Sequence, residues 1–288
     1  MTITHHTVQC LNAQGFHNMH YTSWGQSDNP NIVMCIHGLT RNGRDFDTLA
    51  QSLANDFQVI CPDIVGRGQS DWLPNKQYYG MPQYMADINT LLAKLSAKIP
   101  RCVHWVGTSM GGMIGMVMAS LPQTPIQSIV INDVGTHIDK IALERIARYV
   151  GLTPTFASYA EINLYMRAIC RPFGPLNDAQ WDHLTKHNVK QNAQGLWTLN
   201  YDPGIAQPFQ DSVIAEVDLS SFYEKISCRA LLLRGKDSDL LSHATAHRMT
   251  QTGPKAQLIE FDGVGHAPML MTEDQISSVQ KFLHPYKQ

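Results

Sequence analysis

The stretch VHWVGTSMGGMIG, residues 103–115, holds one serine between glycines at the point where one apolar run hands over to the next. Its residues 107–111, GTSMG, fit the pattern G-x-S-x-G, with a strand expected before them and a helix after them. A serine on so sharp a turn adopts strained backbone angles, and neighbouring side chains would clash, so small residues are needed on both sides. The helix amino terminus favours negative charge that develops nearby. The stretch therefore predicts a nucleophile, Ser109.

Composition narrows the class of protein. The chain has 288 residues, 43% hydrophobic and 16% charged, with a formal net charge of -2. This balance predicts a globular protein with a substantial core, and it gives no basic patch for nucleic acid or for a membrane surface. We therefore expect a small-molecule partner, neither nucleic acid nor membrane. The sequence does not decide between a monomer and a dimer.

The amino terminus and the cysteines bear on location. The first fifteen residues lack a basic segment followed by an apolar one, so no signal peptide is expected, and no apolar run is long enough to cross a membrane. The six cysteines are scattered and form no C-x-x-C pair, which argues against a zinc site and a disulfide framework. These observations predict a cytoplasmic protein that binds no metal.

Short apolar runs alternate with helical patterns along most of the chain, as in a mostly parallel sheet with crossover helices. Two further strands near the amino terminus are expected to pair antiparallel at the edge, and the last helix is expected to start at Thr272 with a capping box to Gln275. The strands of the parallel part are expected at 31–38, 57–64, 101–107, 127–135, 230–235 and 256–261.

The segment 136–226 breaks this alternation. It shows helical patterns but no convincing strand, and it is rich in large aromatic side chains. We expect an all-helical cap over the carboxyl ends of the strands, where open α/β sheets bind their ligands. Its large side chains are expected to form the cap's own core more often than substrate contacts; they include Tyr165, Met166, Trp181 and Trp197.

A serine nucleophile needs a base, and the base needs an acid that orients it. In strand–turn–helix sites of this kind the order along the chain is serine, acid, histidine. His266 lies in the loop FDGVGHAPML after the last expected strand and is the predicted base. The predicted acid is Asp239, with Asp237 as the next choice. Asp133 is a third option, expected rather to bind local backbone amides.

Ester cleavage also needs donors for the oxyanion. The backbone N–H of Met110, directly after the nucleophile, is one expected donor, and the N–H of Leu39, after His37-Gly38, is the other. Nearby polar residues are expected to fix the loops around the site: Arg41, Asn42 and Asp45 after the first parallel strand, and Asp63, Arg67 and Asp71 after the second.

Five motifs, in order along almost the whole chain, together resemble the α/β-hydrolase superfamily, in particular its capped, esterase-like branch. The resemblance implies an eight-stranded sheet, a helical lid between strands six and seven, and a Ser-Asp-His triad that needs no cofactor or metal. The chain departs from many relatives in having Ser238 where they carry the acid, and the later aspartate of its R-G-x-x-S-D spacing supports Asp239 over Asp237. The motifs are HGLTRNGRDF (37–46), PDIVGRGQSDW (62–72), GTSMGG (107–112), RGKDSDLLS (234–242) and GVGHAP (263–268).

These inferences predict a core domain of residues 1–135 and 227–288, a helical cap of residues 136–226, and a serine hydrolase that cleaves a carboxylic ester or related acyl compound through an acyl-enzyme. Ser109 argues against dehalogenases and epoxide hydrolases of this superfamily, which carry aspartate at the same turn. Carbon–carbon bond hydrolases, lactonases, perhydrolases and acyltransferases share the triad and stay open as alternatives. A non-catalytic binding protein of the same fold is a further alternative.

Overall fold

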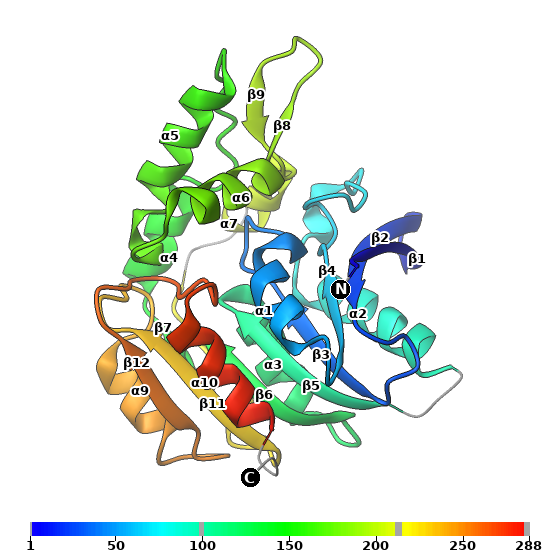
Figure 1. The fold of residues 1–288 in the computed structure, drawn as a ribbon, viewed down its shortest axis with the longest axis vertical. Helices are drawn as coiled ribbons and strands as arrows, with labels where there is room; N and C mark the ends of the chain where they lie inside the picture. The colour runs from blue at the N-terminus through cyan, green and yellow to red at the C-terminus, as the bar shows by residue number, and fades with distance from the viewer. Residues whose placement is uncertain (1, 98–100, 211–214, 285–288) are drawn as a thin grey trace.

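An eight-stranded sheet forms the centre of the computed structural model, which describes residues 2–97, 101–210 and 215–284 (Figure 1). The strand order is β1-β2-β4-β3-β5-β6-β11-β12. The strands are β1 (Thr4–Asn12), β2 (Gly15–Trp24), β3 (Asn31–Ile36), β4 (Gln58–Pro62), β5 (Cys102–Thr108), β6 (Ile126–Asn132), β11 (Arg229–Gly235) and β12 (Gln257–Phe261).

The six strands from β4 to β12 in this order run parallel, whereas β1 and β2 form an antiparallel hairpin. β2 also pairs antiparallel with β4, so only β1 of the hairpin is an edge strand. The expected strands are all present. The central ones are buried along nearly their whole length, which is why they read as continuous apolar runs rather than alternating ones.

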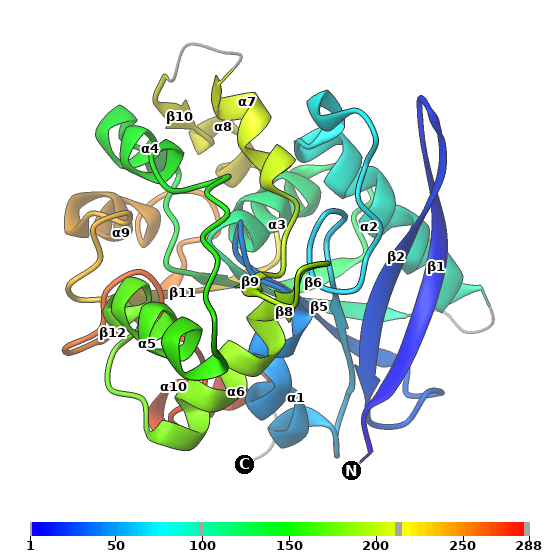
Figure 2. The same ribbon diagram turned by 90° about the horizontal axis from the view of Figure 1, so that it is seen from above.

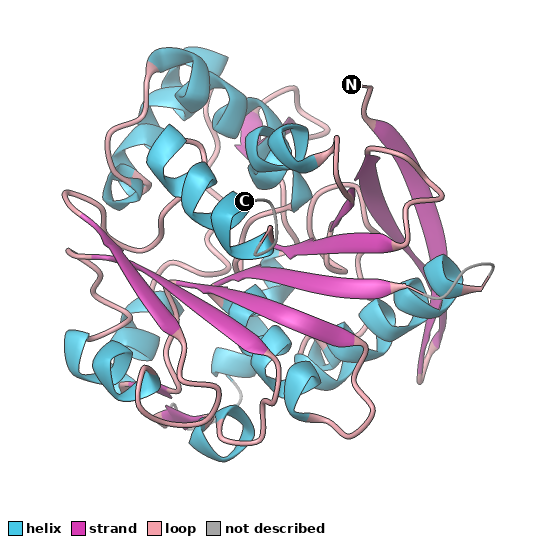
Figure 3. Cartoon of the chain, turned by 60° about the horizontal axis from the view of Figure 1, so that its bottom comes forward, coloured by secondary structure: helices cyan, strands magenta, loops and turns pink. Residues whose placement is uncertain are grey.

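Helices cover both faces of the sheet (Figure 3). Helices α1 (Asp47–Leu53) and α10 (Glu273–Leu283) pack on one face around Leu49 and Phe282. The other face carries α2 (Met81–Ser96), α3 (Met110–Ser120), α8 (Ser220–Tyr223) and α9 (His243–Met249). Short 3-10 helices are η1 (Gly43–Phe46), η2 (Lys76–Tyr78), η3 (Arg171–Phe173) and η4 (Pro203–Ala206).

The start of α10 departs from the expected capping box. Thr272 is the N-cap, as predicted, but its hydroxyl bonds Asp274 rather than a backbone amide of the first turn. The Gln275 side chain instead accepts a hydrogen bond from the backbone N–H of Leu270. Gln275 therefore holds the loop that leads back towards His266, and this tertiary contact replaces the local one.

The segment 136–226, called the insertion below, lies between β6 and β11, the sixth and seventh strands of the main sheet. Figures 1 and 2 show its helices and its hairpin gathered at one end of the sheet. It contains α4 (Lys140–Ala147), α5 (Tyr159–Ile169), α6 (Asp178–Asn188) and α7 (Gln207–Gln210), the hairpin of β8 (Val189–Gln191) and β9 (Trp197–Leu199), and the pair of β7 (His137–Ile138) and β10 (Val217–Asp218).

The expectation of an all-helical insertion is therefore wrong. Its strands have only two or three residues each, too few for a readable alternation of polar and apolar side chains. Its end also belongs to the core by packing, because Tyr223 of α8 is buried with the side chains under the sheet. The exact division of the chain into two domains stays a prediction.

The insertion has a small hydrophobic core of its own, which includes Ile162, Met166, Trp181 and Leu184. Two methionines from the loop after His266 complete this cluster, Met269 and Met271. The insertion is thus anchored on the same loop that carries the predicted base. Among the described residues, no helix combines the length and the hydropathy needed to cross a bilayer.

Candidate active site

The turn between β5 and α3 has the strained geometry that the glycines predict. Ser109 has φ +53° and ψ −115°, a region that residues with a side chain rarely adopt. A Cβ at Gly107 would lie 2.2 Å from the carbonyl oxygen of Gly111, and a Cβ at Gly111 would lie 2.0 Å from the carbonyl oxygen of Ile36. Glycine is required at both positions because backbone occupies the space of any side chain.

His266 lies in the loop between β12 and α10 and faces this serine. Its Nε2 atom is 3.0 Å from Oγ of Ser109, and its Nδ1 atom is 2.8 Å from Oδ2 of Asp133. With Nδ1–H donated to the carboxylate, Nε2 is free to accept the serine proton. The histidine side chain is one-fifth exposed and the carboxylate of Asp133 is fully buried.

Asp133 follows β6 directly, with φ +54°. Its Oδ1 accepts a hydrogen bond from the backbone N–H of Gly235, and its Oδ2 accepts a second one from the hydroxyl of Ser238, at 2.6 Å. Together with His266, three donors compensate the burial of this charge. The predicted contact with backbone amides is present, but the same carboxylate also orients the histidine.

The structure corrects the preference for Asp239 as the acid. Asp239 is exposed and forms an ion pair with Arg145 of α4, so it does not reach His266. Asp237, the second choice, is also exposed. Both follow β11, the neighbour of β6 in the sheet, and Ser238 between them is the residue that turns towards Asp133.

Asn132 is a brace that sequence reasoning missed. Its side-chain amide donates to Thr108 Oγ1, 2.9 Å away, and to the backbone carbonyl of Pro268, 2.8 Å away. Its backbone carbonyl accepts from the N–H of Ser109. One residue at the end of β6 thus fixes the serine turn and the histidine loop. The asparagine of INDVG was readable only as a strand end, and nothing local signals these contacts.

The loop after β3 lies against the nucleophile. An added Cβ on Gly38 would be 3.7 Å from Cβ of Ser109, and Leu39 lines the same cavity. His37 is buried; it hydrogen-bonds the carbonyl of Gly38 and accepts from the N–H of Ile64. Burial lowers the pKa of His37 to about 4, so the imidazole is neutral at pH 7 and acts as a fixed brace.

Arg67 connects the two positions predicted to supply oxyanion donors. Its guanidinium is fully buried, with Nε donating to the carbonyl of Leu39 at 2.8 Å and Nη2 lying 3.8 Å from Sδ of Met110. Nη1 donates to Tyr84 Oη and to the carbonyl of Val65. The planar fork of donors therefore fixes the oxyanion loop relative to the start of α3.

The polar residues after β3 hold the loop and the insertion together. Arg41 pairs with Asp45 through two hydrogen bonds of 2.7 Å. The Asn42 amide donates to the carbonyl of His187, and the Asn188 amide donates to Asp45. These residues thus fix the loop, as expected, and in addition they fasten it to the end of α6. Asp63 has a similar role lower in the site, since Gly43 and Gln69 amides donate to its carboxylate.

A cavity of about 450 Å³ opens above Ser109 and His266 between the sheet and the insertion. Its volume lies within the range of about 300–1,000 Å³ that is typical of small-molecule sites. Tyr165 and Met166 line it, so the expectation that they serve only the core of the insertion is wrong for these two. Trp181 belongs to that core, as expected. Most of the remaining wall is apolar, including Ile146, Ile169, Phe173 and Leu199.

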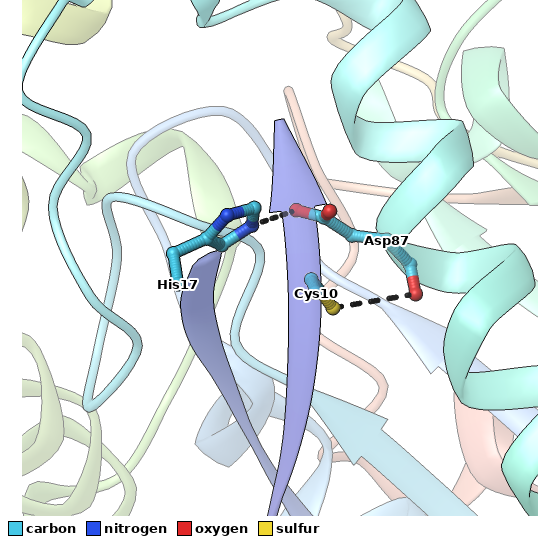
Figure 4. A group of neighbouring side chains, drawn as sticks. All are labelled: Cys10, His17 and Asp87. Carbon is cyan, nitrogen blue, oxygen red and sulfur yellow. Dashed lines mark hydrogen bonds and ion pairs between the residues drawn. The ribbon is translucent and has the colours of Figure 1, made fainter. Parts of the chain in front are cut away.

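Two side-chain groups of the described residues have the types and spacing of metal ligands. Cys10, His17 and Asp87 meet between the hairpin and α2 (Figure 4). Zinc would need the thiolate, but burial and the charge of Asp87 raise the pKa of Cys10 to about 12. The carboxylate already accepts from His17 and from Gln83. We interpret this group as an anchor between β1, β2 and α2.

The second group, Asp47, His183 and His187, lies where α6 meets the start of α1. Its carboxylate is bound through two oxygens by the Arg44 side chain at 2.8 and 2.9 Å. Neither group lines the cavity at Ser109. The prediction that the chemistry needs no metal and no cofactor stays a prediction.

Comparison with known proteins defines the class. The sequence profile of the alpha/beta hydrolase fold matches residues 31–271, and the chain belongs to this family. The 3-hydroxybutyrate-oligomer hydrolase of Cupriavidus necator is 41% identical over 283 residues, which cover 96% of each chain. The predicted fold and the predicted reaction class, a hydrolase of ester bonds, are confirmed at this level.

Solved structures agree with the sheet and the insertion described above. A putative hydrolase from Rickettsia typhi is similar over 100% of both chains, with 31% sequence identity and a TM-score of 0.91. An alpha/beta hydrolase from Novosphingobium aromaticivorans is similar over 97% of this chain and 98% of its own, with 32% identity and a TM-score of 0.85.

Proposed function

We propose that this chain hydrolyses short esters of hydroxy acids, with Ser109 as nucleophile, His266 as base and Asp133 as the acid that orients it. The observation that carries the proposal is the hydrogen-bonded chain Ser109–His266–Asp133 at the base of the cavity. The acid differs from the residue that sequence spacing favoured, because contact decides the role.

The reaction follows from the positions of the atoms. Oγ of Ser109 attacks the ester carbonyl carbon while Nε2 of His266 takes its proton, giving a tetrahedral intermediate. The imidazolium then protonates the alkoxy oxygen, the alcohol leaves, and an acyl-enzyme remains. Water, deprotonated by the same nitrogen, releases the acid and restores the serine. Asp133 holds Nδ1–H and stabilises the imidazolium in both halves.

The backbone N–H groups of Met110 and Leu39 are the proposed oxyanion donors. Met110 is the first residue of α3, where the helix dipole favours negative charge, and Leu39 lines the cavity opposite. The buried contacts of Arg67 to both residues support a fixed spacing between them. A donor of this kind contributes about 3–4 kcal/mol to lowering the barrier.

The substrate class comes from two sources. The relative from Cupriavidus necator is named for oligomers of 3-hydroxybutyrate, which are linear esters of a short hydroxy acid. The cavity of about 450 Å³ with mostly apolar walls suits a molecule of that size and polarity. We therefore propose a small-molecule ester of this class as the partner.

A fluorophosphonate probe and an oligomer assay test the proposal. Wild-type protein should be labelled on Ser109, as located by mass spectrometry, and should release 3-hydroxybutyrate from its dimer and trimer in a chromatographic assay. Ser109→Ala should lose the label and at least about 1,000-fold in turnover. Absence of both label and turnover in wild-type protein would contradict the proposal. Product analysis with added alcohols distinguishes hydrolysis from acyl transfer, and a carbon–carbon bond substrate tests the remaining alternative.

We also propose a cytoplasmic location. All six cysteines are free thiols, and four of them are buried. Free buried thiols suit a reducing compartment. Fractionation of cells that express the tagged protein tests this, and recovery in the periplasm or medium would contradict it.

A further inference from the structure

Two of the described side chains that line the cavity are arginines, Arg41 and Arg145. They stand out because the rest of the wall is mainly apolar and the reaction itself uses neither of them. A buried or half-buried arginine suits the binding of a carboxylate, since its planar donors match the two oxygens. The question is whether either guanidinium is available to a ligand.

Arg41 is already fully engaged. Its Nε and Nη2 atoms each donate to one oxygen of Asp45, four residues along the same loop, at 2.7 Å. The two side chains are only 11% and 8% exposed, and the guanidinium also lies over the ring of Phe173. A pair so short in sequence and so buried is part of the loop, and a ligand would have to break it to bind.

Arg145 differs in each of these respects. It comes from the last turn of α4, and its partner Asp239 comes from the loop after β11, 94 residues away. The two side chains are 39% and 54% exposed. Within the described ranges, neither side chain has another hydrogen bond or ion pair. An exposed pair of this kind contributes little to stability because water screens it, so another carboxylate can take the place of Asp239.

We propose that Arg145 binds a free carboxylate of the substrate and that Asp239 is the counter-ion which this carboxylate displaces. The inference rests on the proposed ester hydrolysis. In a linear ester of hydroxy acids, one end of the chain carries a free carboxylate, and the unit at that end is the alcohol that leaves when the last ester bond is cleaved.

The wall next to Arg145 fits the rest of such a molecule. Ile146 and Tyr149 of the same segment line the cavity beside it, and Ser109 lines the same cavity below. A short apolar chain with one anionic end can therefore lie against these side chains while its ester reaches the serine. The inference names Arg145 as the residue that selects carboxylate-terminated esters over neutral ones.

The test uses two substrates that share one ester bond. The first is the linear dimer of 3-hydroxybutyrate, and the second is the same dimer with its terminal carboxylate replaced by a carboxamide. We expect wild-type protein to prefer the free acid, and Arg145→Gln to reduce the ratio of the two kcat/KM values by about tenfold or more. Arg145→Lys, which keeps the charge, should retain part of the preference.

Two further variants sharpen the measurement. Asp239→Asn removes the competing carboxylate and should lower KM for the free acid. Arg148→Gln is the matched control, because Arg148 is an exposed arginine of the same segment that does not line the cavity. It should leave the ratio as in wild type.

A binding measurement separates this inference from the proposed activity. In the Ser109→Ala background, calorimetry with the intact dimer should show weaker binding after Arg145→Gln, whether or not the wild-type chain turns the dimer over. An unchanged ratio together with unchanged binding would overturn the inference. So would an equal loss for both substrates with unchanged binding, which would identify the Arg145–Asp239 pair as a latch between α4 and the core.

Discussion

The base of the cavity and its upper wall are built in different ways. The base consists of residues at the carboxyl ends of β3, β5, β6 and β11, joined by hydrogen bonds of 2.6–3.0 Å and packed through glycines that admit no side chain. The wall comes from the insertion, with apolar side chains and one exposed ion pair. The comparison teaches that the reacting atoms are held by backbone and buried polar groups, whereas substrate selection is left to a layer that can vary.

The difference predicts unequal effects for acids that look alike in the sequence. Asp133→Asn should lower kcat by about 10,000-fold, because the amide can no longer hold His266 in the required tautomer. Asp239→Asn should lower kcat on a neutral ester by less than about tenfold. Steady-state kinetics with a chromogenic ester measures both.

Asp237→Asn, on an exposed residue between the same strand and loop, is the control and should resemble wild type. Similar large losses for the Asp133 and Asp239 variants would break the distinction between base and wall. Circular dichroism checks that each variant is folded.

The insertion has its own core, so damage to it should reduce stability. Trp181→Ala removes a large side chain from a cluster that contacts Met269 and Met271, and it should lower the free energy of unfolding by about 3–4 kcal/mol. Urea denaturation followed by fluorescence measures this. Leu164→Ala on α5, which is 68% exposed, is the control. A loss below about 1 kcal/mol for Trp181→Ala would show that the cluster contributes little.

The base of the site should be sensitive to acid. Burial lowers the pKa of His37 from 6.5 to about 4, so the folded protein favours the neutral imidazole. Above pH 6.5 both states are neutral and the contribution is fully present; as the pH falls from 6.5 towards 4, the unfolded chain binds a proton that the folded chain does not. The free energy of unfolding should therefore fall by about 3 kcal/mol through this group.

Urea midpoints measured between pH 7.5 and 4.5 check this expectation. His37→Gln should show a smaller dependence on pH in that window than wild type, and His243→Gln, on an exposed histidine, should not. A pH dependence that is the same in wild type and in His37→Gln would assign the acid sensitivity to other groups.

Arg67 sharpens the comparison from the side of the base, since it touches both proposed oxyanion residues without touching the cavity. Arg67→Met should lower kcat by about 100-fold with little change in KM, because it loosens the donors that act on the transition state. Arg67→Lys cannot replace the fork and should recover only part of the rate. A change in KM alone would contradict a role in positioning.

Ser238 should have the smallest effect among the residues of the base. Ser238→Ala removes one of three donors to Asp133 and should lower kcat by about tenfold, since Gly235 and His266 remain. Ser238→Thr keeps the hydroxyl and is the matched control. Equal rates for wild type and Ser238→Ala would show that the hydroxyl does not support the carboxylate.

Local patterns carried most of the fold. The apolar runs predicted the strands of the sheet, and the hairpin was predicted at the amino terminus. The short strands of the insertion were missed because two or three residues give no readable period. The cap of α10 failed for a related reason, since a tertiary contact of Gln275 with Leu270 competes with the local one.

By itself the sequence determined the turn at Ser109, the loop that carries His266 and the order of strands and insertion, because these depend on local sterics and on periodic burial. Only the tertiary structure decided which aspartate meets the histidine. Asp133 and Asp239 follow neighbouring parallel strands and both come to the same edge of the sheet. The positive φ of Asp133 and the donors from Gly235 and Ser238 aim one carboxylate inward, while Arg145 of the insertion holds the other at the surface.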